Sequence, residues 1–287
     1  MDFVTWAKSP WGQSIPEHAA WYLAGVAVIA GLCFMIVHSL YVGLIAPQKT
    51  FAKNEAPATA QAAIPERVPR HSLAARIFHW VMAASMLTLL FTAFLPKIGV
   101  QFNWVLYHWI AGCVLTVSIG FHIVHSFFMD PWSIWPDKID VRDAMRRMRR
   151  LWGKPSPPPE RFAKYPLENK LYHLAIVFSA LAVMCTGLFM MKRIETPFFT
   201  RNPYIFSDMT WGLMYVLHGL AGIGLIALVM VHVYMGLRPE KLPITKSMLF
   251  GWMSRDFYLE EHDPKRWAVQ QSSKPNEKAN LAASDAD

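Results

Sequence analysis

Hydrophobic residues in this chain of 287 are gathered into five long blocks, with polar stretches between them. The blocks cover residues 19–45, 72–96, 102–128, 170–192 and 209–236. Each block approaches or exceeds the roughly 20 residues that an α-helix needs to cross a bilayer. We therefore predict an all-α integral membrane protein with five transmembrane helices.

The polar stretches divide the chain into four parts. Residues 1–45 carry the first transmembrane helix, and residues 46–70, which are rich in Ala and Pro, are expected to form a cytoplasmic linker. Residues 71–267 hold the other four blocks, which we predict to form a four-helix bundle. The polar tail 268–287 is expected to be disordered.

Composition and charge agree with a membrane setting. Hydrophobic residues make up 54% of the chain and charged residues 17%, and the net charge is +8. The basic residues gather in segments that flank the blocks, where topology and anionic lipid account for them, so we expect no nucleic acid partner. The positive-inside rule then predicts an N-terminus outside the cell and a cytoplasmic C-terminus.

Four histidines form two pairs with identical spacing inside hydrophobic blocks. His108 and His122 lie in the third block, and His218 and His232 lie in the fifth. Fourteen residues of α-helix rise about 21 Å and complete almost four turns, so the imidazoles of a pair share a helix face at opposite bilayer depths. Two such helices could hold two haems, because each haem needs only two axial ligands. No Cys-x-x-Cys-His motif occurs, which predicts non-covalent haems of b type.

The second and third blocks are echoed by the fourth and fifth. The corresponding stretches are 76–80 with 170–174, 91–94 with 185–188, and 108–122 with 218–232. Such a repeat predicts two equivalent helical hairpins and a nearly symmetric core. The small pairs Ala111-Gly112 and Ala221-Gly222, with Gly224, are expected to leave room between the helices for flat macrocycles.

The remaining histidines are expected to have simpler roles. His38 and His125 lie within blocks, where a single imidazole is expected to hydrogen-bond a neighbouring helix. His18, His71 and His262 lie outside the blocks and are expected to be solvated.

From about residue 72 to 267 the chain resembles a family of membrane di-haem cytochrome b subunits. The family serves respiratory formate dehydrogenases (as the gamma subunit), thiosulfate reductases and nickel–iron hydrogenases. The matching features are the Arg-x-x-His-Trp motif at 76–80, His108 with Gly112, His218, the His-x-Tyr motif at 232–234 and the tail motifs within 247–267.

The resemblance implies the axial ligands of the haems. An outer haem is expected between His108 and His218, and an inner haem is expected on His232. For the second inner ligand, the formate dehydrogenase subunit's pattern assigns His79, whereas His122 would give the arrangement of the cytochrome bc complexes. Both candidates stay open at this point.

Two further sets of residues are candidates for the haem environment. A third haem between His79 and His173 is an alternative that the repeat allows. Basic residues near the inner ends of the blocks are candidates for contacts with haem propionates or with a quinone oxygen. They are Arg76, Arg161, Lys164 and Lys170.

The expected function is transmembrane electron transfer by a di-haem cytochrome b that anchors a respiratory oxidoreductase and reacts with quinone. The resemblance implies an iron–sulfur or cytochrome subunit and a catalytic subunit as partners, menaquinone or ubiquinone as electron carrier, and the bacterial inner membrane as location. The chain itself is expected to be non-catalytic, because it has no dinucleotide loop, phosphate loop or iron–sulfur cysteine set. The alternatives are a transporter or proton channel with histidine relays, and a stand-alone transmembrane haem reductase.

Overall fold

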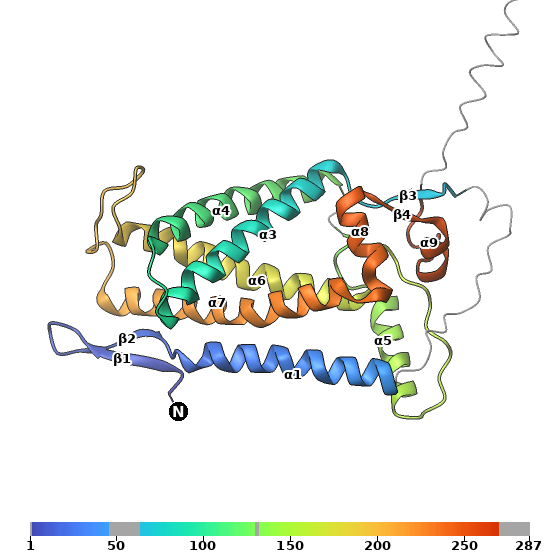
Figure 1. The fold of residues 1–287 in the computed structure, drawn as a ribbon, viewed down its shortest axis with the longest axis horizontal. Helices are drawn as coiled ribbons and strands as arrows, with labels where there is room; N and C mark the ends of the chain where they lie inside the picture. Colours follow the sequence, from blue (N-terminus) through green and yellow to red (C-terminus); the bar gives the residue numbers. More distant parts are fainter. Residues whose placement is uncertain (1, 46–63, 130–131, 270–287) are drawn as a thin grey trace, which may run out of the picture. The chain divides into compact units, whose positions relative to one another are not determined.

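Five long helices and a β-hairpin form the first of two units in the computed structural model (Figure 1). The structure describes residues 2–45, 64–129 and 132–269. Of these, the first unit takes in 2–45, 73–129, 132–135 and 168–242, and the second takes in 64–72, 136–167 and 243–269. Most of the predicted linker 46–70, and nearly all of the predicted tail 268–287, lie outside the described residues.

The five helices coincide with the five hydrophobic blocks. They are α1 (Tyr22–Leu44), α3 (Leu73–Phe94), α4 (Trp104–Met129), α6 (Leu167–Met190) and α7 (Asp208–Leu237). In the described part of the chain, these five are long and apolar enough to cross a membrane, which confirms the prediction. Their outer faces stay apolar, as lipid requires: Val117 is 73% exposed and Phe178 72% exposed.

The helices of the first unit are not equally close to one another. The backbone of α3 runs close to that of α4, and α1 runs close to α7. Within the described residues, α6 has no comparably extended close approach to another helix. It contacts its neighbours through side chains, because Ala180 of α6 is buried with Leu115 and Ile119 of α4 in an apolar cluster.

The chain begins with a hairpin that the sequence analysis did not anticipate. Strands β1 (Val4–Lys8) and β2 (Ser14–Ala19) pair antiparallel, and β2 packs against the first half of α7 (Figure 1). The contact is close, since a Cβ added at Gly212 would lie 1.9 Å from the carbonyl oxygen of Pro16. We call this end of the first unit the hairpin end, and the end at which α7 finishes the far end.

The second unit combines short helices with a two-stranded sheet. Its elements are β3 (Arg67–Pro69), α5 (Lys138–Leu151), α8 (Leu242–Phe250), β4 (Trp252–Ser254) and α9 (Arg255–Glu261). Strands β3 and β4 pair antiparallel, which joins the segment before α3 to the C-terminal segment. Asp137 and Asp140 form a capping box at the start of α5, and the Arg266 guanidinium bonds both carboxylates.

Two polar side chains, Arg70 and His262, are buried in the second unit. Arg70 is 5% exposed and donates to the carbonyl of Lys164, and burial lowers the pKa of its guanidinium to about 10. His262 is only 1% exposed, and its Nδ1 lies 2.7 Å from the carbonyl oxygen of Ala163. The expectation that His262 is solvated was therefore wrong. The aromatic ring of Tyr258 stacks against the imidazole and helps to exclude water from it.

Candidate haem sites between the helices

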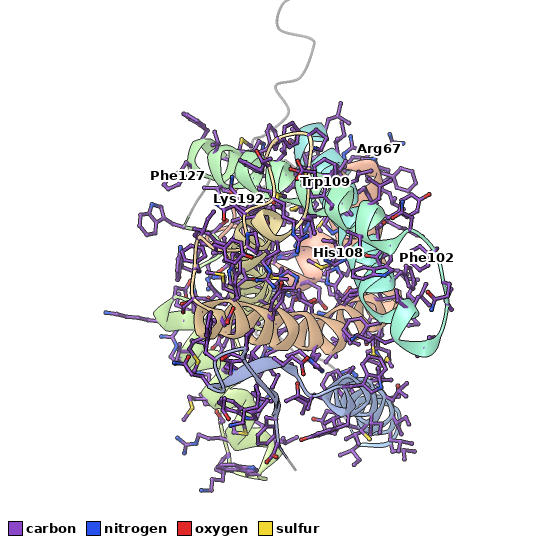
Figure 2. The ribbon with its side chains drawn as sticks, turned by 90° about the vertical axis from the view of Figure 1, so that its left-hand side faces the viewer. Arg67, Phe102, His108, Trp109, Phe127 and Lys192 are labelled. Carbon is purple, nitrogen blue, oxygen red and sulfur yellow. The ribbon has the colours of Figure 1, made fainter. Side chains whose placement is uncertain are left out.

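Six histidines of the first unit lie in three couples between helices. The couples are His108 of α4 with His218 of α7, His79 of α3 with His232 of α7, and His122 of α4 with His173 of α6. Their ring centroids are 6.2, 6.3 and 5.9 Å apart, in that order. The first couple lies toward the hairpin end, where Figure 2 shows His108 among the helices, and the other two lie toward the far end.

These separations fit the geometry of two imidazoles on one iron. Metal–nitrogen bonds of about 2 Å place the centroids of two rings on opposite sides of a metal about 6 Å apart. Within the described residues, no cluster of three or more His, Cys, Asp or Glu side chains could hold a bare metal ion. Couples of imidazoles therefore suit a macrocycle that brings its own four nitrogens.

A threonine on the neighbouring helix fixes the protonation of His108. The Thr92 hydroxyl lies 2.7 Å from the carbonyl oxygen of Thr88 and 2.8 Å from Nδ1 of His108. A hydroxyl has one hydrogen, so if it donates to the carbonyl it accepts from Nδ1–H. Nε2 of His108 then carries a lone pair, which is the state that a metal ligand needs.

The second hairpin repeats this arrangement at His218. The Thr186 hydroxyl bonds the carbonyl of Ala182 and lies 2.9 Å from Nδ1 of His218. A Cβ at Gly187, which follows Thr186, would lie 3.3 Å from the His218 ring. The absence of a side chain at this position therefore prevents a steric clash with the imidazole. Thr92 and Thr186 are the second residues of the repeated stretches 91–94 and 185–188. Their equivalence in the repeat was the signal that could have identified them.

The helix face one turn after each histidine of this couple has open space beside it. Gly222 comes one helical turn after His218, on the same face of α7. A Cβ at Gly222 would meet no atom within 4 Å, and one at Gly112, one turn after His108, would meet its nearest atom at 4.0 Å. The space expected beside the small residues is present, and it suits a flat group next to the imidazoles.

At the far end, the structure brings His79 next to His232 and brings His122 next to His173. The two candidates for the second inner ligand therefore have different partners. Tyr172 stacks on His232 with a centroid distance of 5.3 Å and an interplanar angle of 15°. The Tyr172 hydroxyl donates to the carbonyl of Leu228, which holds the phenol ring against the imidazole.

Three buried ring nitrogens lack a hydrogen-bond partner among the described residues. They are Nδ1 of His79, Nδ1 of His173 and Nε1 of Trp109, which follows His108 in α4. A buried polar atom without a partner is costly, and such atoms often mark the place of a bound group. The residues present therefore fit a haem with polar propionates better than they fit a plain apolar core.

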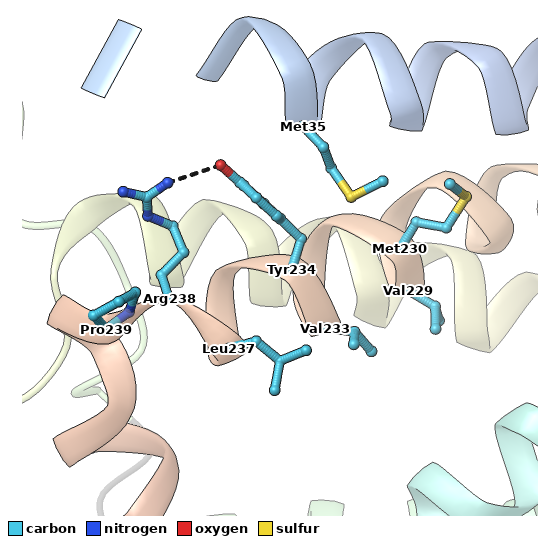
Figure 3. Close-up of a pocket in the computed structure, with 8 residues that line it drawn as sticks. All are labelled: Met35, Val229, Met230, Val233, Tyr234, Leu237, Arg238 and Pro239. Carbon is cyan, nitrogen blue, oxygen red and sulfur yellow. Dashed lines mark hydrogen bonds between the residues drawn. The ribbon is translucent and has the colours of Figure 1, made fainter. Parts of the chain in front are cut away.

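An open apolar pocket of about 670 Å³ lies at the far end of α7, beside α1 (Figure 3). Its polar side chains are those of Tyr234 and Arg238, and the Arg238 guanidinium donates to the Tyr234 hydroxyl at 2.9 Å. From α1, His38 Nδ1 and Ser39 Oγ lie 3.0 and 2.7 Å from the same hydroxyl. The predicted hydrogen bond from His38 to a neighbouring helix is thereby confirmed.

Comparison with known proteins identifies the family. The family model described as prokaryotic cytochrome b561 matches residues 70–251, which is more than half of the chain and includes all six histidines of the couples. No curated protein matches the chain. With five membrane-spanning helices and imidazole couples that fit haem, the chain belongs to the prokaryotic cytochrome b561 family and is a multi-pass membrane cytochrome of b type.

Proposed function

We propose that this protein carries electrons across the membrane through two b-type haems at opposite ends of the bundle. His108 and His218 bind one haem, and His79 and His232 bind the other. The observation that carries this proposal is the ring separation of 6.2 and 6.3 Å in the two couples, which fits one iron in each. A haem supplies a one-electron carrier, and two of them divide the low-dielectric layer into shorter steps.

The assignment of His79 as the partner of His232 has two supports. The His79 ring lies 6.3 Å from His232, while the neighbour of His122 is His173 on another helix. Tyr172 also covers one face of the His232 imidazole, which limits the orientations that this ring can take. In this assignment His122 binds neither of the two haems.

We further propose that the protein anchors a respiratory oxidoreductase and exchanges electrons with quinone, as the resemblance to formate dehydrogenase, thiosulfate reductase and hydrogenase subunits implies. The pocket at the far end suits a quinone, because its wall is largely apolar and its polar side chains, Tyr234 and Arg238, can donate hydrogen bonds. A quinone carbonyl could accept from the Tyr234 hydroxyl or from Arg238. Tyr234 follows His232 by two residues, so the pocket and the haem of the far end share one segment of α7.

The proposed orientation places the far end at the cytoplasmic face of a bacterial inner membrane. Basic residues support it, because the segment between α4 and α6 is rich in Lys and Arg. They are Lys138, Arg142, Arg146, Arg147, Arg149, Arg150, Lys154, Arg161 and Lys164. The hairpin end would then face the outside, where an iron–sulfur or cytochrome subunit with its catalytic subunit would dock.

Proteoliposomes test the electron transfer directly. Vesicles that contain the protein and trapped ferricyanide are mixed with an added quinol, and ferricyanide reduction is followed by its absorbance. We expect reduction well above that of protein-free vesicles, loss of the excess in His108→Ala, and wild-type rates in His125→Ala. Protein that purifies with haem but gives no excess reduction would contradict the proposal.

Purification from native membranes tests the partner. An electron-transfer and a catalytic subunit that co-purify in fixed ratio with the chain support the role as an anchor. A chain that purifies alone and passes electrons from quinol to an added acceptor at the rate seen in native membranes would instead be a stand-alone reductase.

A further inference from the structure

The repeat of two hairpins is present in the contacts as well as in the sequence. Thr92 bonds His108 in the first hairpin, and Thr186 bonds His218 in the second. At the other end, a ring on the first helix of each hairpin packs against a histidine on the second. These contacts are Phe78 with His122 at 4.8 Å and Tyr172 with His232 at 5.3 Å.

The two-fold symmetry of the hairpins maps one couple onto itself and exchanges the other two. Exchanging the hairpins takes α3 onto α6 and α4 onto α7, so His108 and His218 simply exchange places. The same exchange takes His79 onto His173 and His232 onto His122. The couple of His122 with His173 is therefore the symmetry equivalent of a proposed haem site, and its ring separation of 5.9 Å is close to that of its equivalent.

The second couple has the chemistry of the first as well as its spacing. Nδ1 of His173 is buried without a hydrogen-bond partner among the described residues, as Nδ1 of His79 is. A cationic residue precedes each of these histidines by three positions, Arg76 in one case and Lys170 in the other, and the buried Lys170 ammonium already donates one hydrogen bond to the Trp135 carbonyl. A basic side chain one turn away is suited to the carboxylates of a haem.

A direct contact between the imidazoles does not explain the couple. In the described structure no hydrogen bond joins His122 to His173, and the hydrogen bond found for His122 is to Ser126 on its own helix, at 3.4 Å. A ring separation near 6 Å is longer than a hydrogen-bonded pair of imidazoles needs and agrees with an iron between them.

We propose that His122 and His173 are the axial ligands of a third b-type haem, which lies at the far end of the bundle. The third site adds to the two haems of the proposed function and is not needed for them. A failure of this proposal is therefore distinguishable from a failure of that function.

Haem stoichiometry tests the third site. The full chain is expressed in a haem-replete host, and haem per chain is measured as the pyridine haemochromogen in wild type and in His122→Ala, His173→Ala and the double variant. We expect three haems in wild type and two in each of the variants, because both ligands serve one haem. His125→Ala is the matched control, since His125 also contacts Phe78 from α4, and it should keep three.

A second measurement separates ligation from a structural role. In His122→Met, a methionine–histidine pair would raise the reduction potential of one haem and leave the other two unchanged. This shift is read in a potentiometric titration of the protein, and it does not depend on activity. A wild-type ratio of two, or three haems that persist in both alanine variants, would overturn the proposal.

Discussion

The hydroxyl of Thr92 lies 2.8 Å from Nδ1 of His108 and donates its one hydrogen to the Thr88 carbonyl, so it can accept from Nδ1–H and leave Nε2 free to bind iron. Replacing the threonine with valine keeps the shape of the side chain and removes the acceptor. We expect Thr92→Val to weaken haem retention at His108 and His218 by about 10- to 100-fold, the usual effect of losing such a hydrogen bond. The rate of haem transfer to apomyoglobin measures it.

Thr92→Ser is the control for this prediction, because serine keeps the hydroxyl. Thr186→Val should act on the same haem as Thr92→Val, since its hydroxyl bonds the other ligand of the couple, His218. Equal haem retention in Thr92→Val and Thr92→Ser would mean that the hydrogen bond does not support ligation.

The space beside Gly222 gives a second prediction. Leucine at this position would occupy the open volume on the His218 face of α7, so Gly222→Leu should lose the haem of His108 and His218 and keep the haem of His79 and His232. Gly224→Leu is the matched control, because residue 224 lies on nearly the opposite face of the helix and also has open space around it. The absorption spectrum of each variant measures its haem content. A wild-type haem content in Gly222→Leu would contradict the prediction.

Tyr234 allows a test of the pocket. Tyr234→Phe removes the hydroxyl that bonds Arg238 and faces the pocket, and it leaves the aromatic ring. We expect KM for quinol to rise about three- to tenfold, the cost of one hydrogen bond, with haem content unchanged. Steady-state kinetics in proteoliposomes measure it. A quinol site elsewhere would leave KM at its wild-type value.

The hairpin gives a prediction about stability. A Cβ at Gly212 would lie 1.9 Å from the Pro16 carbonyl oxygen, so Gly212→Ala must push the hairpin away from α7. Overpacking of this kind costs about 1–3 kcal/mol. Trypsin cleavage after Lys8 should become faster. Gly25→Ala, where a Cβ meets no atom within 4 Å, should be cleaved at the wild-type rate.

Tyr258 predicts a pH dependence in the second unit. Burial, with a smaller effect from Asp263, raises the pKa of the Tyr258 phenol to about 12. The folded state thus favours the neutral phenol, so its stabilisation is complete below about pH 10, the pKa of an exposed tyrosine, and is lost as the pH rises toward 12. Tyr258→Phe should reduce this fall in the free energy of unfolding. An absorbance titration of tyrosinate should also lose one step near pH 12.

The fold could be predicted from the sequence because the signals for it are local. Twenty or more consecutive apolar residues must form a helix in lipid, where each backbone polar group needs an internal partner. The five helices followed from this rule. The hairpin of residues 4–19 did not, because short strands with mixed side chains have no comparable signal and are stabilised here by packing on α7. His262 was misjudged for a related reason, since its burial depends on segments that are distant in the chain.

The sequence alone determined which histidines face inward and at what depth, because helical periodicity fixes the face and rise of every residue in a helix. Depth could not distinguish His79 from His122, which lie at the same level on adjacent helices. Only the tertiary structure decided that His79 lies beside His232 and His122 beside His173, because the partner of an imidazole depends on which helices face each other across the bundle. That choice is made by packing between helices, and no pattern within a single helix encodes it.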